Sequence, residues 1–268
     1  MAIKFNPLVR QAVFTGYTYT IGQNGMITPM LHYTPVEFYG GIHTKSSGHS
    51  YARFKELNLA IGDAVELEYT NDVMPYVTKP ENEFNLHNSM KPNVPEDTFP
   101  TMCPCCGAPL EISKSGKSIY CTNIECSDRE VNRMTNMLAK LGVKDFSDAS
   151  VRKLGVRFFH ELMTLSLDQL SILGEKNASN LKTQLDALRK NPIYDFKIIG
   201  ALGFTDIAIK TWKLIFQQLS LDEFLHYYTQ YGGNTSNLRA QLISIKGIGP
   251  ATIDSILKEL PYFWKDIY

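Results

Sequence analysis

The stretch Cys103-Pro104-Cys105-Cys106-Gly107, followed by Cys121-Thr122-Asn123-Ile124-Glu125-Cys126, decides how the middle of this chain folds. Read as C-x2-C, fourteen residues and C-x4-C, it has the spacing of a zinc site. Four thiolates about 2.3 Å from one Zn²⁺ complete its tetrahedral coordination and leave no position for water or substrate. We therefore predict a structural zinc ion, with the ligands Cys103, Cys106, Cys121 and Cys126.

Disulfide bridges and free buried thiols are the alternative interpretations of these cysteines. Disulfides need an oxidising compartment, but residues 1–7 have no charged start followed by an apolar run, so no signal peptide is expected. A reducing cytoplasm is expected instead, where this spacing favours a metal. The fifth cysteine, Cys105, lies between two ligands, and its side chain is expected to point away from the metal.

The composition is that of a globular chain with more than one domain. Its 268 residues are 44% hydrophobic, enough to build substantial cores, and no apolar run approaches the roughly 18 residues of a membrane span. The net charge is zero, so charge alone predicts no partner. Residues 1–100 carry a net charge of −3 and residues 101–268 a net charge of +3, so phosphate binding is expected in the second part.

Residues 10–79 have the pattern of β-strands. Val13–Ile21 is rich in β-branched and aromatic residues, and the pair Asn24-Gly25 after it predicts a hairpin with a type I′ turn. Residues 64–69 alternate apolar and acidic side chains with a period of two. We predict a small barrel of about five strands.

Residues 80–99 are predicted to be a linker, because they contain prolines and acidic residues without periodicity. Proline and charge repulsion keep such a segment extended, so we expect it to let the flanking regions move relative to one another. The expected boundaries are 1–82 for the barrel, 83–99 for the linker, 100–133 for the zinc module and 134–268 for a helical domain.

After the cysteines the apolar residues recur at helical spacing, and the junctions between helices are informative. Ile245 to Thr252 has the form of a helix-hairpin-helix, in which Gly247 and Gly249 make a tight turn and Ala251 lets the next helix pack closely. Glycine at such a turn lets backbone amides reach a DNA phosphate at a helix N-terminus, whose partial charge is positive.

Three further junctions resemble this one: 173–178 closely, and 144–149 and 201–208 as degraded copies in which Ser147, Ala149 and Ala208 replace glycines. One junction alone is as readily a plain helical corner, but four at similar intervals favour a repeat array. The degraded copies are open to a packing role alone. The residues predicted to bind DNA are Gly174, Lys176, Asn177, Gly203, Gly247, Gly249 and Thr252.

A barrel, a four-cysteine module and a helical array in this order resemble the C-terminal half of bacterial NAD-dependent DNA ligase. Phe99–Gly107 is similar to the start of that family's zinc module, and Ile21–Pro29 to the hairpin of its OB-fold. Ile61-Gly62-Asp63 with Asp72-Val73-Met74-Pro75 is similar to Ile-Gly-Asp … Asp-Val-Ile-Pro. The resemblance covers nearly the whole chain and implies a multidomain α+β fold, with an OB-fold β-barrel, a small zinc module of four cysteines and an all-α helix-hairpin-helix array.

Parts of the family are missing from this sequence. It has no Lys-x-Asp-Gly, the motif whose lysine is adenylated, no domain for the nicotinamide mononucleotide half of NAD, and no BRCT-like tail after Tyr268. The resemblance thus implies one subunit of a split ligase, a heterodimer with a separate adenylation subunit, as expected of a bacteriophage with divided genes acting in the host cytoplasm. Met1 at a plausible start and Tyr268 after the last helix argue against a stray fragment.

Ala2-Ile3-Lys4-Phe5 resembles the family's last nucleotidyltransferase motif, Ala-x-Lys-Phe, a strand that would complete the partner's adenylation domain. A fixed positive charge there stabilises the charge that develops in phosphoryl transfer, so Lys4 is the predicted catalytic residue of this chain. An ordinary exposed lysine near the N-terminus is the alternative.

The family's reaction implies NAD and Mg²⁺ as cofactors, nicked double-stranded DNA as substrate, and a role in DNA replication and DNA repair. DNA binding is expected to be independent of sequence and sensitive to salt. The family's usual Arg-Ala-Gly is replaced by Tyr69-Thr70-Asn71, which removes a charged contact expected of the OB-fold. A non-catalytic DNA-binding or scaffolding protein derived from a ligase is the alternative function.

Overall fold

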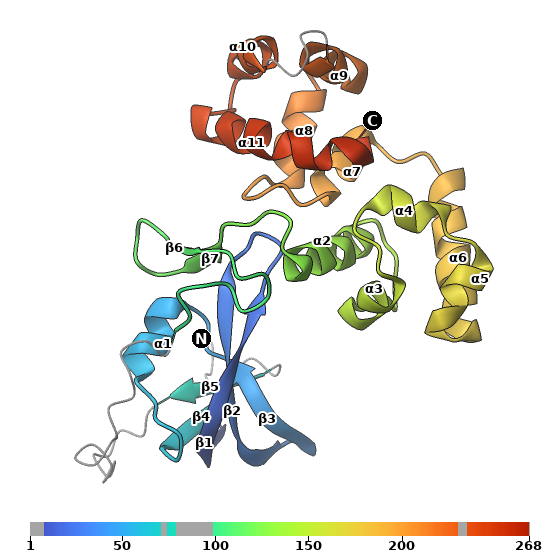
Figure 1. Ribbon diagram of the computed structural model, residues 1–268. Coiled ribbons are helices and arrows are strands. Elements are labelled where there is room, and N and C mark those ends of the chain that lie inside the picture. Colours follow the sequence, from blue (N-terminus) through green and yellow to red (C-terminus); the bar gives the residue numbers. More distant parts are fainter. Residues whose placement is uncertain (1–7, 71–73, 79–98, 230–234, 268) are drawn as a thin grey trace, which may run out of the picture. The chain divides into compact units, whose positions relative to one another are not determined.

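The computed structural model describes residues 8–70, 74–78, 99–229 and 235–267 (Figure 1). The chain divides into two compact units, Met1–Asn123 and Ile124–Tyr268, which are described one at a time. Across the described residues, no helix combines the length and the apolar character that a membrane crossing requires.

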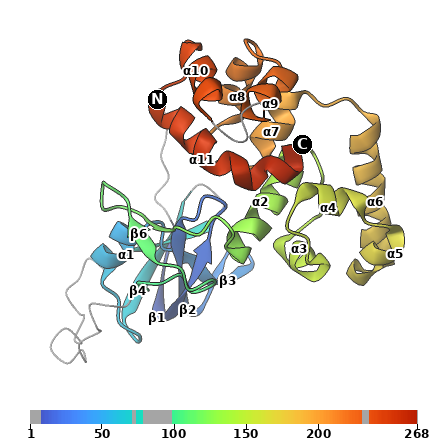
Figure 2. The ribbon, with the colours of Figure 1, turned by 45° about the horizontal axis from the view of Figure 1, so that its top comes forward.

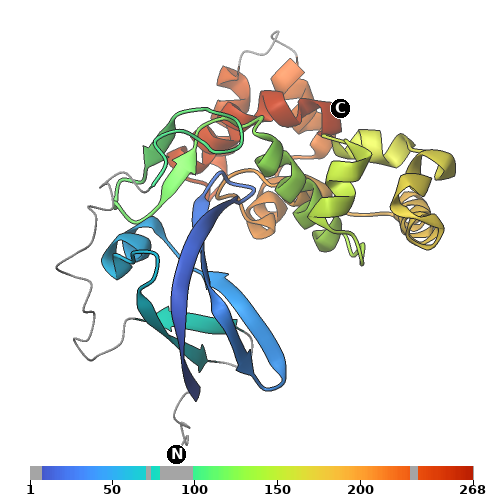
Figure 3. The same cartoon turned by 60° about the horizontal axis from the view of Figure 1, so that its bottom comes forward.

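A five-stranded antiparallel sheet of order β3-β2-β1-β4-β5 forms most of the first unit, which confirms the prediction of five strands. The long first strand pairs with β2 through its second half and with β4 through its first half, and a bulge between Phe14 and Gly16 separates the two stretches. Bulges bend strands, and here the edge strands β3 and β5 approach one another, as in a half-closed barrel (Figure 3). The elements are β1 (Leu8–Ile21), β2 (Ile27–Phe38), β3 (Gly41–Ser47), α1 (Tyr51–Leu57), β4 (Ala64–Thr70) and β5 (Met74–Thr78).

The inside of this sheet is apolar because alternate residues of each strand point inward. Leu31, Val65 and Leu67 have no exposed surface, and Phe14 is 1% exposed. Burying each such side chain stabilises the fold by about 1.5–3 kcal/mol. The short helix α1 begins with Ser50, whose Oγ accepts a hydrogen bond from the backbone N–H of Arg53 at 3.2 Å.

The turn between β1 and β2 forms where it was predicted, but its type was predicted wrongly. The backbone N–H of Gly25 donates to the carbonyl oxygen of Gly22, and Gly25 alone in this turn has a positive φ, of 84°. A type I′ turn needs positive φ at both central residues, Gln23 and Asn24. The geometry instead fits a type I turn followed by one left-handed glycine, which is the next commonest hairpin connection.

A second, two-stranded sheet of β6 (Leu110–Ile112) and β7 (Ile119–Cys121) is attached to that turn. The backbone N–H of Cys121 donates to the carbonyl oxygen of Gly25 at 2.8 Å. Phe99 is buried among Tyr19, Tyr51 and Phe54 of the larger sheet and of α1, with ring centroids 4.8–5.8 Å apart. Residues 99–121 thus contact the larger sheet and α1, and the predicted linker lies almost wholly outside the described residues.

The second unit is entirely helical among its described residues (Figure 2). It contains two apolar cores. One core joins α2 to α3–α6, and the other joins α2 to α7–α11. Helix α2 contributes Leu138 to the first core and Met137 to the second, so it connects them. The helices are α2 (Ser127–Lys140), α3 (Asp148–Leu154), α4 (Phe159–Thr164), α5 (Leu167–Leu170), the 3-10 turn η1 (Ser171–Leu173), α6 (Glu175–Lys190), α7 (Asp195–Ala201), α8 (Ile209–Phe216), α9 (Leu221–Thr229), α10 (Ser236–Ser244) and α11 (Pro250–Ile267).

Candidate metal centre and helix junctions

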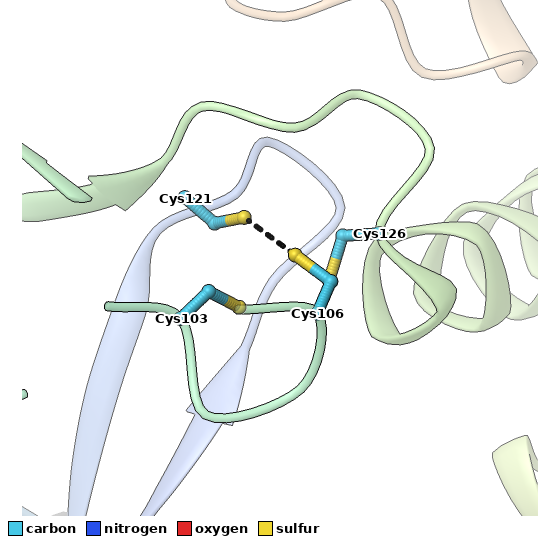
Figure 4. Close-up of side chains that lie close together, drawn as sticks. All are labelled: Cys103, Cys106, Cys121 and Cys126. Carbon is cyan, nitrogen blue, oxygen red and sulfur yellow. Dashed lines mark hydrogen bonds between the residues drawn. The ribbon is translucent and has the colours of Figure 1, made fainter. Parts of the chain in front are cut away.

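The four predicted cysteines lie together, with all their sulfur atoms within 4.8 Å of one another (Figure 4). Two of these atoms, Sγ of Cys106 and Sγ of Cys121, are 3.6 Å apart. Ligands about 2.3 Å from a tetrahedral zinc ion are about 3.8 Å apart, whereas a disulfide needs about 2.05 Å. None of the five cysteines forms a disulfide, and the exposed Cys105 lies outside the cluster, as predicted. The cluster can therefore hold a metal ion with four sulfur ligands.

Two turns of backbone hold the ligands in place. The backbone N–H of Cys103 donates to the carbonyl oxygen of Ala108, and the N–H of Gly107 donates back to the carbonyl oxygen of Cys103. This loop closes because Gly107 adopts a φ of 70°, which costs glycine little. Cys121 ends β7, so the bond to Gly25 fixes its backbone.

Cys126 is fully buried and occupies the N-cap position of α2. The first backbone amides of a helix carry partial positive charge, which favours a thiolate at this position. The next turn begins with Glu130, whose backbone N–H donates to the carbonyl oxygen of Cys126 at 3.0 Å. The fourth ligand is thus fixed by the start of a long helix rather than by a loop.

Burial and hydrogen bonding act differently on two of the thiols. Burial raises the pKa of Cys106, but hydrogen bonds from Ala108, Asn123 and the neighbouring cysteines outweigh it, so that the pKa falls to about 7. Burial raises the pKa of Cys121 to about 12. Cys106 thus loses its proton more readily than Cys121, and a divalent metal would favour the deprotonated form of both by binding it.

Buried charged side chains follow Cys126 on α2 and connect it to distant segments of the helical unit. Glu130 accepts a hydrogen bond from Arg157, whose Nε–H is shared between the two carboxylate oxygens at 3.0 Å, and another from the hydroxyl of Tyr262. Arg129 lies 4.0 Å from Glu259 of α11. That carboxylate also accepts hydrogen bonds from the backbone N–H and the hydroxyl of Thr205, at 2.8 and 2.5 Å.

Arg133, one turn further along α2, is 4% exposed and faces the rings of Tyr262 and Phe263 at 4.9 and 5.3 Å. Its Nη1 donates to the carbonyl oxygen of Ile124 at 2.6 Å. The short segment before Cys126 is therefore fastened to the body of α2. These charged residues were not identified from the sequence, because their partners are far away in the chain.

All four predicted junctions lie between helices, and each contains a residue with positive φ. Three of them share one geometry: a left-handed residue, then an apolar residue and one more before the helix begins. The left-handed residues are Asp145, Asp206 and Gly247, with φ of 59°, 60° and 96°. The two aspartates were not predicted from the sequence, although aspartate is among the side chains that tolerate this conformation.

The junction before α11 leaves its predicted residues accessible. Gly247 and Gly249 are exposed, and Thr252 is half-buried in the first turn. A Cβ added to Gly249 would meet nothing within 4 Å, and its φ is not in the left-handed region. The fold therefore does not require glycine at this position. The predicted close packing at Ala251 is wrong, because Ala251 is exposed and Ile253 is the buried residue.

The other predicted DNA-binding residues differ in accessibility. Gly174, Lys176 and Asn177 are exposed at the start of α6, where Asn177 Nδ2 donates to the carbonyl oxygen of Leu173 at 3.1 Å. Gly203 is buried, so the third junction does not present it to solvent. Lys4 lies outside the described residues.

Tyr69 stands where the resemblance led us to expect an arginine, and it has a packing role. Its ring stacks on Phe38 with centroids 5.1 Å apart and contacts Tyr39 and His43 edge-on at 5.4 and 5.9 Å. An aromatic cluster thus occupies the place of the expected charge.

Comparisons with known proteins agree with the β-sheet fold of the first unit. Residues 12–89 match the family model of the NAD-dependent DNA ligase OB-fold domain. A protein named DNA ligase from Sulfurihydrogenibium sp. (strain YO3AOP1) is 30% identical over 226 residues, which cover 80% of this chain and 31% of that protein. The DNA ligase of Thermosipho africanus is 24% identical over 268 residues, covering 96% of this chain and 38% of the relative.

The chain spans about a third of the length of these relatives. Within that length it contains an α+β fold and a four-cysteine cluster able to bind a metal. Its first part is an OB-fold domain of the NAD-dependent DNA ligase type, and nearly all of the chain is homologous to bacterial DNA ligases.

Proposed function

We propose that this chain is the DNA-binding subunit of an NAD-dependent DNA ligase, which seals nicks in duplex DNA together with a separate adenylation subunit. The observation that carries the proposal is the junction before α11, where the exposed Gly249 is a glycine that the fold does not need. Glycine is expected where another backbone approaches closely, and a DNA phosphate at a helix N-terminus is such an approach. The homology to DNA ligases supports this choice of ligand.

In this proposal, the junctions before α6 and α11 bind the phosphates of the DNA backbone. Gly174 and Gly249 directly precede these helices, and the first backbone amides of a helix have no partner within it. Lys176 is exposed in the first turn of α6 and adds a positive charge. Contacts of this kind position the protein on the duplex without reading its sequence, so affinity depends strongly on salt.

Zinc is the metal that best suits the cluster, because four sulfur ligands at tetrahedral spacing select it. With no open position, the ion has a structural role. It fixes Cys126 at the start of α2, and Arg129 of α2 lies beside Glu259 of α11, which in turn accepts hydrogen bonds from Thr205. Zinc binding would in this way support the helical unit.

The reaction itself draws on groups that this chain does not contain. None of its 268 residues forms a Lys-x-Asp-Gly, so the adenylated lysine is assigned to the partner. When bound to the assembled ligase, NAD would supply the adenylate and Mg²⁺ would neutralise charge on the phosphates. Lys4 is proposed to complete the partner's active site with a positive charge beside the adenylate phosphate. A divided ligase of a bacteriophage, acting in the cytoplasm of its host, is the setting that we infer.

Reconstitution tests the proposal. The full chain, mixed with a separately expressed NAD-dependent adenylation domain, should seal a nicked duplex, and Lys4→Ala should abolish sealing while binding of the duplex persists. Binding without sealing in any such mixture would favour the non-catalytic scaffold. Sealing that is unaffected by Lys4→Ala would remove Lys4 from the active site and leave the subunit assignment in place.

A further inference from the structure

A cavity of about 430 Å³ lies in the helical unit, lined by residues from the end of α2, from α6 and from the start of α7. Two lysines line it, Lys140 and Lys197, and none of the lining residues is acidic. Neither lysine forms an ion pair within the part of the chain that the structure describes. Burial lowers the pKa of Lys140, so its ammonium gains from an anion in the cavity.

One residue that lines this cavity, Tyr194, belongs to an aromatic pair. Tyr194 is 70% exposed, and its ring stacks on Phe196 with centroids 5.4 Å apart and 20° between the planes. Lys197 Nζ lies 5.8 Å from the Tyr194 ring and Lys213 Nζ 5.9 Å from the Phe196 ring. Aromatic rings flanked by cations are the typical stacking platform for single-stranded nucleic acid.

The wall of the cavity is held rigidly. Gln184 of α6 accepts a hydrogen bond from the backbone N–H of Lys144 at 2.7 Å and donates one to its carbonyl oxygen at 3.2 Å. This pair fastens the loop after α2 to α6, so that the side chains lining the cavity need little rearrangement to bind a ligand.

We propose that Lys140, Tyr194, Phe196 and Lys197, here named the lysine–tyrosine pocket, hold an unpaired nucleotide of a DNA strand that leaves the duplex. A backbone phosphate lies between the two ammonium groups, and the base stacks on the exposed ring of Tyr194. Bases inside a duplex are already stacked on both faces, so the platform selects unpaired ones. The inference rests on the proposed function and adds to it a preference for substrates with a single-stranded tail.

The test compares two substrates, a nicked duplex and the same duplex with a short oligothymidine tail, using the zinc-loaded full chain. Stacking of one base and contact with its phosphate should make the tailed duplex bind about tenfold more tightly. Tyr194→Ala and the double variant Lys140→Ala with Lys197→Ala should each remove this advantage and leave affinity for the untailed duplex unchanged. Tyr194→Phe should retain it, because the ring remains.

Exposed lysines elsewhere in the helical unit provide the matched control. The double variant Lys153→Ala with Lys258→Ala removes the same charge, and it should keep the tail advantage. A tail advantage that persists in the pocket variants, or that is absent in the unmodified chain, would overturn the pocket while the proposed function stands. Failure of the unmodified chain to bind either duplex would overturn both.

Discussion

The junction before α8 and the junction before α11 have the same backbone shape, but the first is held by contacts with another helix and the second is exposed to solvent. Before α8, Thr205 donates two hydrogen bonds to Glu259, Ser255 Oγ donates to the carbonyl oxygen of Thr205, and Gly203 is buried. Before α11, Gly247 and Gly249 are exposed, and a Cβ at Gly249 would touch nothing.

This difference shows that one backbone shape is fixed by contacts with other helices before α8 and is open before α11. The bonds that fix the α8 junction come from α11, the helix that the open junction begins. A degraded copy that has lost its glycines can thus position the copy that keeps them. We expect changes at the α8 junction to alter stability, and changes at the α11 junction to alter DNA affinity.

Removing the metal should destabilise the protein more than any of the substitutions below. The α8 junction should be the first part of the helical unit to lose protection from hydrogen exchange. Structural zinc sites contribute about 10–16 kcal/mol of apparent binding free energy. Without the ion, Cys126 no longer fixes the start of α2, and Arg129 is less firmly held against Glu259. Hydrogen exchange after chelation should show the amide of Thr205 losing protection while strand β1 keeps it. Equal protection at Thr205 with and without metal would show that α2 does not transmit the effect.

Glu259→Ala should be the next largest change, with a loss of about 3–5 kcal/mol in the free energy of unfolding, because it leaves buried polar partners unpaired. The carboxylate is 9% exposed and serves Thr205 as well as Arg129. Urea denaturation measures the loss.

Asp254→Ala, on the same helix, is the control for Glu259→Ala. Asp254 pairs with Arg239 at 2.5 Å, but both side chains are exposed, so the cost should stay below about 1 kcal/mol. Similar losses for the two variants would contradict the distinction between the buried carboxylate of Glu259 and the exposed carboxylate of Asp254 on α11.

Gly249→Val should leave stability unchanged and weaken binding of nicked duplex by about tenfold, since a side chain there would keep a phosphate from the helix amides. Fluorescence anisotropy measures the affinity, and zinc content should stay at the level of the unmodified chain. Gly247→Val is less informative, because φ of 96° strains any side chain at that position. Unchanged affinity in Gly249→Val would reduce the junction to a helical corner.

The features that could be predicted from the sequence are those that the spacing of residues alone determines. The cluster of four cysteines follows from the spacing between them in the sequence, and the five strands follow from alternation and β-branched residues. The pair Asn24-Gly25 located a turn but not its type, because both hairpin turns accept a glycine at that position.

Features that depend on contacts across the chain could not be predicted. Thr205 and Glu259 are 54 residues apart, and neither residue type indicates a partner. Phe99 follows a proline-rich segment that suggests mobility, yet its ring is buried against Tyr19 and Phe54. The left-handed conformation of Asp145 and Asp206 could not be predicted, because glycine is the residue type that usually marks such a turn.

Asp206→Gly also tests the comparison between the α8 and α11 junctions, and its expected effect is the smallest. Aspartate at φ of 60° is strained, and glycine removes that strain, but the greater freedom of glycine in the unfolded chain offsets the gain by about 0.5–1 kcal/mol. Stability should therefore change little in a thermal melt. DNA affinity should also stay within about twofold, because a charge further than a Debye length from the phosphates is screened. A marked rise in affinity would mean that Asp206 lies near DNA and repels it, and the α8 junction would then belong to the binding surface.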